Sequence, residues 1–343
     1  MKKKFIPFIT AIIAVAVTLG GCSCTGTTPL VFNDGFNGGT SASYPYKETL
    51  TYDVDYIKSY GDNFTKSPQL SDDALNIEIS GTYTVTLEVI DRNDSSKLQN
   101  IQSDLLADGV DVGSSIYNLK THLDITSTYS TGKEGENPSS PEKKEFITTD
   151  AYFLSSGFSF NPLYSETNGH TSLVVADDEG LSITFMDYST KIEYNKGDYV
   201  ITAKYGNTDQ PVKEYGYSYK TAIDNNTLLF ALRNISLDVD GQYNLDVVHA
   251  SYGDPQNLVV KNLAERTENF EINDISESVK VKEYSFVRNV QNSTGTPQYV
   301  VIQKEKTENL ANRSLLIQYT APMSCYNSFI CLGGLQYTLK TVS

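Results

Sequence analysis

Tryptophan is absent from the 343 residues of this chain, and histidine occurs only three times. Many sugar-binding surfaces stack their ligand on the large indole ring, so the absence of tryptophan disfavours sugar binding without excluding it. The three histidines are scattered, which gives no local support for a hydrolase base or a metal site. Strand neighbours predict a solvent-facing His122, the preceding Asn168-Gly169 predicts a turn before His170, and His249 follows a predicted strand.

Sequence motifs for phosphate binding and serine hydrolysis are also missing. The glycines at 36–40 lack the lysine and the helix of a phosphate loop. The segment 155–159 is the nearest approach to G-x-S-x-G, but it lacks the strand–turn–helix context. The acidic clusters at 177–180 and 238–241 lack calcium-loop spacing and predict hairpin turns instead. We therefore predict no catalytic residue, no metal ligand and no cofactor.

Positive charge is scarce, with 27 Lys and Arg against 42 Asp and Glu, for a net charge of −15. Three of the lysines lie in residues 1–21, so removal of that segment would bring the charge to −18. Such a surface repels nucleic-acid phosphates and anionic lipid headgroups. We expect no nucleic-acid partner, and we assign the acidity to solubility.

The N-terminus carries an export signal. Lys2–Lys4 precede an apolar run, Phe5–Val17, which is shorter than the roughly 20 residues of a membrane span. Small residues follow, and Leu19-Gly20-Gly21-Cys22 resembles the lipobox of bacterial lipoproteins. The resemblance implies cleavage before Cys22 and lipidation of its thiol by a diacylglycerol that carries palmitate-type chains. The alternative is an ordinary signal peptide with a chance cysteine.

These observations predict three regions: a lipoprotein signal peptide at 1–21, a flexible tether at 22–44 rich in Gly, Ser and Thr, and an antiparallel β domain at 45–343. Two or more fatty chains anchor a protein stably. We expect a protein held at the cell membrane or the outer membrane through Cys22, facing outside the cytoplasm.

Two further cysteines lie near the C-terminus, Cys325 and Cys331. An exported domain meets a non-reducing space, so a short disulfide between them is our preferred interpretation. A metal site would need more ligands than the scattered histidines supply, and two free thiols are the remaining alternative.

Alternation of apolar and polar residues dominates the chain after residue 45. In 81–89, four apolar residues share one face while three threonines and a glutamate share the other, as in an antiparallel sheet with one buried face. The same pattern predicts strands at 48–56, 117–129, 191–205 (two strands around 195–198), 214–220, 235–248 (a hairpin at 240–241), 278–287, 297–307, 313–322 and 333–342.

Helical spacing is scarce. The segment 95–109 has apolar residues at helical intervals, and 224–235 has cap-type residues at Asn226 and Thr227 before one or two turns. The segment 131–145 is charged and rich in Pro, Gly and Ser, which predicts a long loop. The pattern therefore predicts an all-β, mainly antiparallel protein with one or two short helices.

The body of the chain resembles uncharacterised half-barrel proteins of the bacterial envelope, a family described only as a domain of unknown function. The resemblance lies in pattern and order over roughly 46–343, and it is carried by 48–56 with 81–91, 150–168, 224–237 and 333–343. It implies one long antiparallel sheet that curves part-way round a concave face. It implies no activity.

Several of the 24 tyrosines recur on apolar strand faces. They could fill a core, which is the simpler interpretation. They could instead line the concave face, because a curved sheet without a second sheet must cover its inner side. The candidate ligand-facing residues are Tyr52, Tyr56, Tyr83, Tyr215, Tyr217 and Tyr219.

We weigh three functions. The first is a non-catalytic envelope lipoprotein that binds an apolar or amphipathic ligand, or a partner protein, in the concave face of the sheet. The second is a β-sandwich adhesion or assembly module, whose two stacked sheets would show crossing connections. The third is an envelope hydrolase. Strand order and the filling of the concave face are the features that separate them.

Overall fold

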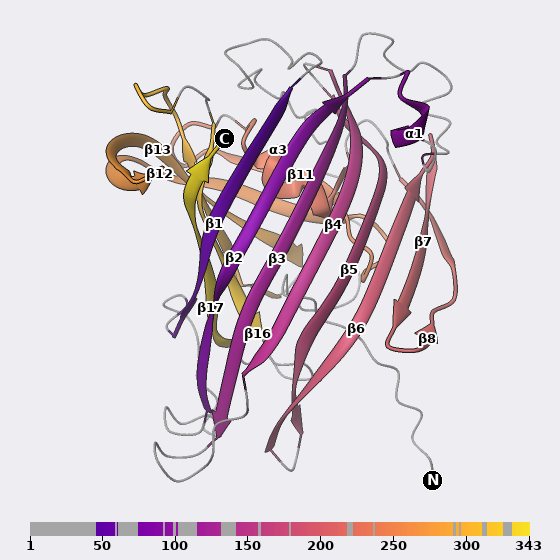
Figure 1. Cartoon of the computed structure of the whole chain (residues 1–343). Helices are drawn as coiled ribbons and strands as arrows, with labels where there is room; N and C mark the ends of the chain where they lie inside the picture. Colours follow the sequence, from indigo (N-terminus) through magenta and orange to yellow (C-terminus); the bar gives the residue numbers. More distant parts are fainter. Residues whose placement is uncertain are drawn as a thin grey trace.

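The computed structural model describes residues 46–58, 60, 75–91, 93–98, 101, 115–131, 142–156, 159–177, 180–217, 222–235, 237–290, 293–294, 296–310, 314–324 and 331–343. Within these residues the chain is almost entirely strand, with two short helices and one 3₁₀ turn (Figure 1). The prediction of an all-β class is confirmed.

The first half of the sheet is a meander in which each strand pairs antiparallel with the next. The short strands β8 and β9 both pair with β7. The bounds are β1 (Lys47–Ile57), β2 (Leu75–Ile90), β3 (Ser115–Thr131), β4 (Lys143–Ser156), β5 (Ser159–Asp177), β6 (Gly180–Tyr194), β7 (Asp198–Tyr205), β8 (Thr208–Asp209) and β9 (Lys213–Gly216).

The second half continues from the other side of β1, because β1 also pairs with the C-terminal strand β17. From there the order runs back through β16, β15, β13, β12 and β11 to β10, and β10–β11 is the one parallel pair among the described strands. The bounds are β10 (Ala222–Asp224), β11 (Gln242–Val248), β12 (Gln256–Ile272), β13 (Ile275–Val290), β14 (Ser293–Thr294, paired with β13), β15 (Gln298–Gln303), β16 (Leu316–Ser324) and β17 (Cys331–Val342).

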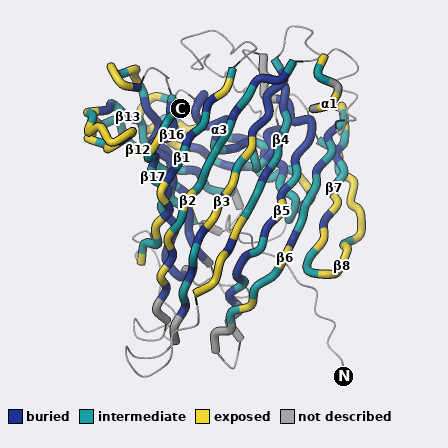
Figure 2. The backbone as a smooth tube through the Cα atoms, viewed as in Figure 1, coloured by how far each residue is buried: buried dark blue, intermediate teal, exposed yellow. Residues whose placement is uncertain are grey.

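The strands therefore form one large curved sheet with next-to-next connections, as predicted for a half-barrel-like protein. Two stacked sheets with crossing connections are not the arrangement of the described strands. Buried residues alternate with more exposed ones along β1, which gives this strand one face toward the interior, whereas residues 161–165 of β5 are all buried (Figure 2).

The centre of the concave face is a packed core. Behind β2 and β3 in Figure 1 lies the helix α3 (Leu228–Leu232), which follows the 3₁₀ turn η1 (Asn225–Thr227). Leu228, Phe230 and Leu232 belong to the main hydrophobic cluster, and the Phe230 ring lies 5.6 Å from that of Phe153 on β4. The segment of η1 and α3 covers the inner face of the sheet, so the middle of the half-barrel is filled.

A smaller hydrophobic cluster lies on the outer face of the sheet. Ile90, Ile116 and Leu154 are buried there together with Ile101, just beyond the short helix α1 (Ser95–Leu98). The helix predicted at 95–109 is therefore present at its start, and most of its remainder lies outside the described residues.

Several predictions needed correction. The turn expected before His170 is wrong, because Asn168 and Gly169 lie inside the continuous strand β5. The hairpin expected at 240–241 is present only in part. Residues 240–241 form a turn that leads into β11, with Asp240 at a φ of 64°, but no described strand directly precedes this turn. Sequence patterning also missed β4, β5, most of β6, β10 and β12, whereas the exposed position predicted for His122 on β3 is confirmed.

Candidate functional site: a pocket on the inner face of the sheet

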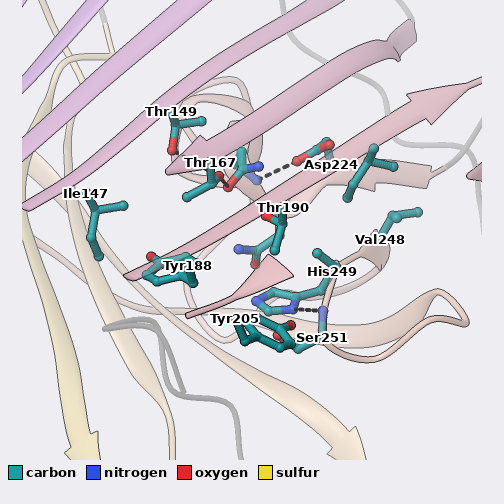
Figure 3. Close-up of a pocket in the computed structure, with 14 residues that line it drawn as sticks. Ile147, Thr149, Thr167, Tyr188, Thr190, Tyr205, Asp224, Val248, His249 and Ser251 are labelled. Atoms are coloured by element: carbon teal, nitrogen blue, oxygen red, sulfur yellow. Dashed lines mark hydrogen bonds between the residues drawn. The ribbon is translucent and has the colours of Figure 1, made fainter. Parts of the chain in front are cut away.

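A pocket lies between the inner faces of β4–β7 and two covering segments, which are β10 with η1 and the turn after β11 (Figure 3). We call it the inner-face pocket, and its volume is about 60 Å³. One buried water needs roughly 10–15 Å³, so the pocket has room for a group of about four to six non-hydrogen atoms.

Tyr188 on β6 lies across Gly169 on β5. The two residues are direct cross-strand partners, and a Cβ atom at position 169 would lie 2.5 Å from Cε1 of Tyr188. Glycine within a strand is typical of such a close approach. The Tyr188 ring therefore reaches past β5 toward Ile147, the partner of Gly169 on β4 (Figure 3).

The hydroxyl of Tyr188 is buried without a hydrogen-bond partner among the described residues. Tyr188 is only 6% exposed, and burial raises the pKa of its phenol, which stays protonated. A buried polar group left unpaired costs about 1–3 kcal/mol. Such a group in a native structure indicates local strain, a functional role, or a bound water or ion.

Asp224, at the end of β10, attaches the segment that covers the pocket (β10 with η1) to the sheet. Its Oδ1 accepts the backbone N–H of Asn226 at 2.7 Å, which caps η1. Its Oδ2 accepts the hydroxyl of Ser165 on β5 at 2.6 Å and that of Tyr194 on β6 at 2.5 Å. Burial raises the pKa of this carboxyl group. The carboxylate thus joins the covering segment to the two strands beneath it.

His249 forms part of the opposite wall, directly after β11. Its Nδ1 accepts the backbone N–H of Ser251 at 3.1 Å, so a neutral ring carries its proton on Nε2. Burial, with a smaller contribution from Arg288, lowers the pKa of His249 to about 4. In Figure 3 the second ring nitrogen faces away from Ser251 and toward the pocket. His249 is therefore a neutral N–H donor at near-neutral pH.

Three threonines form a cross-strand row between these walls. Thr149, Thr167 and Thr190 are successive partners on β4, β5 and β6. The hydroxyls of Thr149 and Thr167 lie 3.3 Å apart, and that of Thr167 donates to Asn226 Oδ1 at 3.3 Å. A threonine hydroxyl both donates and accepts, so the pocket floor offers both kinds of hydrogen bond.

The predicted ligand-facing tyrosines lie elsewhere. Tyr52 is 1% exposed, with its hydroxyl donating to the carbonyl of Leu316 at 2.9 Å, and Tyr56 and Tyr83 pack against the same main cluster. None of the three lines the inner-face pocket. These positions agree with the core-packing interpretation.

The other predicted tyrosines follow the same pattern. Tyr215 and Tyr217 pack around Tyr199 in a separate cluster, with ring centres 5.7 and 5.4 Å from it. Tyr219 lies outside the described residues. A ligand-binding role for any of the six stays a prediction.

The predicted cysteine sites also stay predictions. Cys22 and Cys325 lie outside the described residues, and Cys331 begins β17 with a side chain that is not described. No three His, Cys, Asp or Glu side chains of the described part are grouped as a metal site would require. In the same residues, no helix has the length and apolar character needed to cross a membrane.

The pocket is not predicted from the sequence, because two signals are related only to their own segments of the chain. The pattern predicts a turn at Gly169, although a glycine inside a strand also indicates close packing of a neighbour. The pattern predicts a helix start at Asn226 or Thr227, and Thr227 does precede α3, but the pattern does not indicate the contacts of Asp224 with β5 and β6. His249 carried no signal beyond its place at a strand end.

Neither a protein-family model nor a curated protein matches this chain. Among solved structures, it is similar to a beta-barrel-like protein of a domain of unknown function from Brucella abortus. The TM-score is 0.44 at 6% sequence identity, over 88% of this chain and 99% of that one. The fold assignment above depends on the strand pairing of this chain alone.

Proposed function

We propose that this protein is a non-catalytic binding protein of the cell envelope that holds part of an apolar or amphipathic ligand in the inner-face pocket. The observation that carries the proposal is the Tyr188 hydroxyl, which is buried beside a cavity and has no hydrogen-bond partner among the residues that the structure describes. Pockets that orient ligands combine mostly apolar walls with a few placed polar groups. Ile147, Ile192 and Val248 contribute such walls here.

The size of the pocket limits what it can hold. Pockets for drug-sized ligands measure roughly 300–1,000 Å³, whereas this one measures about 60 Å³. A packed core around α3 occupies the centre of the concave face. An amphipathic ligand would therefore place only one end in the pocket, and its remainder would lie outside.

The expected location at a membrane surface supports the proposed binding function. A lipid on Cys22 and the tether at 22–44 would hold the β domain at the surface of the cell membrane or the outer membrane. Amphipathic molecules concentrate at such a surface, so a tethered pocket would meet its ligand there. The chemistry of the N-terminus and that of the pocket support the same role.

Native mass spectrometry of the protein isolated from its own cells tests ligand binding. We expect an additional bound mass in the wild type that is lost in Thr190→Phe, which fills the pocket from β6. Ser189→Phe is the matched control, because the neighbouring residue of a strand points to the opposite face. Wild-type protein without bound mass, or equal retention in both variants, would contradict the proposed binding.

Metabolic labelling tests the anchor separately. We expect incorporation of an alkyne-bearing palmitate into the wild type and into Cys24→Ser, and none into Cys22→Ser. Fractionation should place the first two with membranes. Labelling that persists in Cys22→Ser would contradict anchoring at this residue.

A further inference from the structure

The inner-face pocket offers hydrogen-bonding groups at two ends (Figure 3). At one end, beside Ile147, the Tyr188 hydroxyl has no partner in the described part of the chain. At the other end, the Nδ1 atom of His249 accepts the N–H of Ser251, which leaves Nε2 as the donor. A ligand that satisfies both must carry at least two polar atoms, one of which accepts.

The pocket wall disfavours a charged ligand. Among the described residues, no lysine or arginine lines it, and Asp224 is the only carboxylate in its wall. An anion would lose its hydration without meeting a cation, which is costly. A cation would compete for Asp224 oxygens that already accept hydrogen bonds from Ser165, Tyr194 and Asn226. The group that fits is therefore uncharged.

Much of the remaining polar wall consists of hydroxyl groups, which both donate and accept, beside the amide side chains of Asn225 and Asn226. The hydroxyls of Tyr188, Thr149, Thr167 and Thr190 are of this kind, whereas a carbonyl ligand could use only their donors. Ile147 and the ring of Tyr188 provide apolar surface beside them. Hydroxyl groups on a short carbon chain match both features, and room for about four to six non-hydrogen atoms matches glycerol in size.

Building on the proposed binding function, we infer that the group held in the inner-face pocket is an uncharged polyol of the size of glycerol, either free or as the end of a larger amphiphile. One hydroxyl oxygen of the ligand accepts the Nε2–H of His249. Another pairs with the hydroxyl of Tyr188. The threonine row binds the remaining hydroxyl, and the carbon chain lies against the apolar wall.

Titration of the mature lipidated protein in nanodiscs tests this inference. The probes are glycerol and acetate at equal ionic strength, and the readout is the imidazole signal of His249 in protein labelled with ¹⁵N-histidine, assigned with His249→Gln. We expect glycerol to give a saturable shift and acetate to give none. The affinity for glycerol should fall about three- to tenfold in Tyr188→Phe, which removes one hydrogen bond.

Control variants separate this loss from misfolding. Tyr243→Phe, on β11 and outside the pocket lining, should bind glycerol as the wild type does. Thr190→Val, which removes a different hydroxyl from the pocket, should also weaken glycerol binding. Unchanged affinity in both Tyr188→Phe and Thr190→Val would overturn the inference.

The outcomes also distinguish this inference from the proposed function. A saturable shift with acetate but not glycerol overturns the polyol assignment and leaves binding in place. No shift with either probe, with a bound mass that Thr190→Phe removes, also overturns the polyol assignment alone. No shift and no bound mass overturn both.

Discussion

The guanidinium of Arg233, just after α3, is held by the carboxylate of Glu48 on β1 through two hydrogen bonds, of 2.5 Å from Nη1 and 3.1 Å from Nη2. Both side chains are buried, at 3% and 2% exposure. The Nε atom of Arg233 also donates to the carbonyl of Ser314 at 2.7 Å. This ion pair attaches the segment that fills the concave face to the strand at which the two halves of the sheet meet.

Arg233→Met should therefore be strongly destabilising. It leaves the Glu48 carboxylate buried without its cation, which costs about 3–5 kcal/mol in comparable pairs. Denaturant unfolding would measure this loss. The double variant Arg233→Met, Glu48→Leu should recover most of it, since no uncompensated charge remains. A single variant within about 1 kcal/mol of the wild type would contradict the prediction.

Gly169→Ala tests the approach of Tyr188 to β5. The added methyl group would lie 2.5 Å from the Tyr188 ring, and forced overpacking costs about 1–3 kcal/mol. We expect a corresponding loss of unfolding free energy and displacement of Tyr188 from the pocket. Gly197→Ala is the matched control, because no atom lies within 4 Å of a Cβ at that position. Equal effects of the two substitutions would show that contact with Tyr188 is not the cause.

The strands were predictable where one face is buried and the other solvated. Period-two alternation identified β1, β2, β3, β7, β13 and β17, because side chains of successive residues point to opposite faces. It failed for β5, where Ser165, Thr167 and Thr171 point inward as polar residues and remove the alternation. One of the three, Thr167, also lines the inner-face pocket, so a residue that removes the strand pattern is also part of the site.

The pocket itself was not predictable from local pattern. Its lining combines β4–β7 with residues near 224 and 249, and only the pairing of distant strands and the contact of Asp224 with Ser165 bring these together. The packing of α3 in the concave face could not be predicted either, because its short apolar run indicates a helix but does not indicate where that helix packs. Register and long-range packing are set by the whole sheet.

Acidification should destabilise the protein through His249. Its pKa is about 4 in the folded state and about 6.5 in an unfolded chain, so the unfolded state binds more protons between these values. The stabilising contribution is complete above pH 6.5 and is lost as the pH falls toward 4, by at most about 3 kcal/mol. Denaturant unfolding from pH 7.5 to 4 should show this slope in the wild type and in His122→Gln, but a reduced slope in His249→Gln.

Asp224 should contribute the opposite pH dependence. Burial raises the pKa of its carboxyl group in the folded state, above the value of about 3.9 in an unfolded chain. Its contribution to stability is therefore greatest below that unfolded-state pKa and decreases as the pH rises through the folded-state pKa. Asp224→Asn keeps an acceptor for the Asn226 N–H and removes this dependence. The stability difference between wild type and variant should thus change with pH in this direction, and a constant difference would contradict it.

Two tyrosine hydroxyls on the same strand should respond oppositely to removal. Tyr194→Phe deletes a hydrogen bond to the buried Asp224 carboxylate, so it should cost about 1.5–3 kcal/mol. Tyr188→Phe deletes a buried hydroxyl that has no hydrogen-bond partner in the described part of the chain, so the ligand-free protein should gain about 1 kcal/mol. Denaturant unfolding of ligand-free protein measures both changes. If Tyr188→Phe is as destabilising as Tyr194→Phe, the Tyr188 hydroxyl already has a partner in the folded chain and is not available to a ligand.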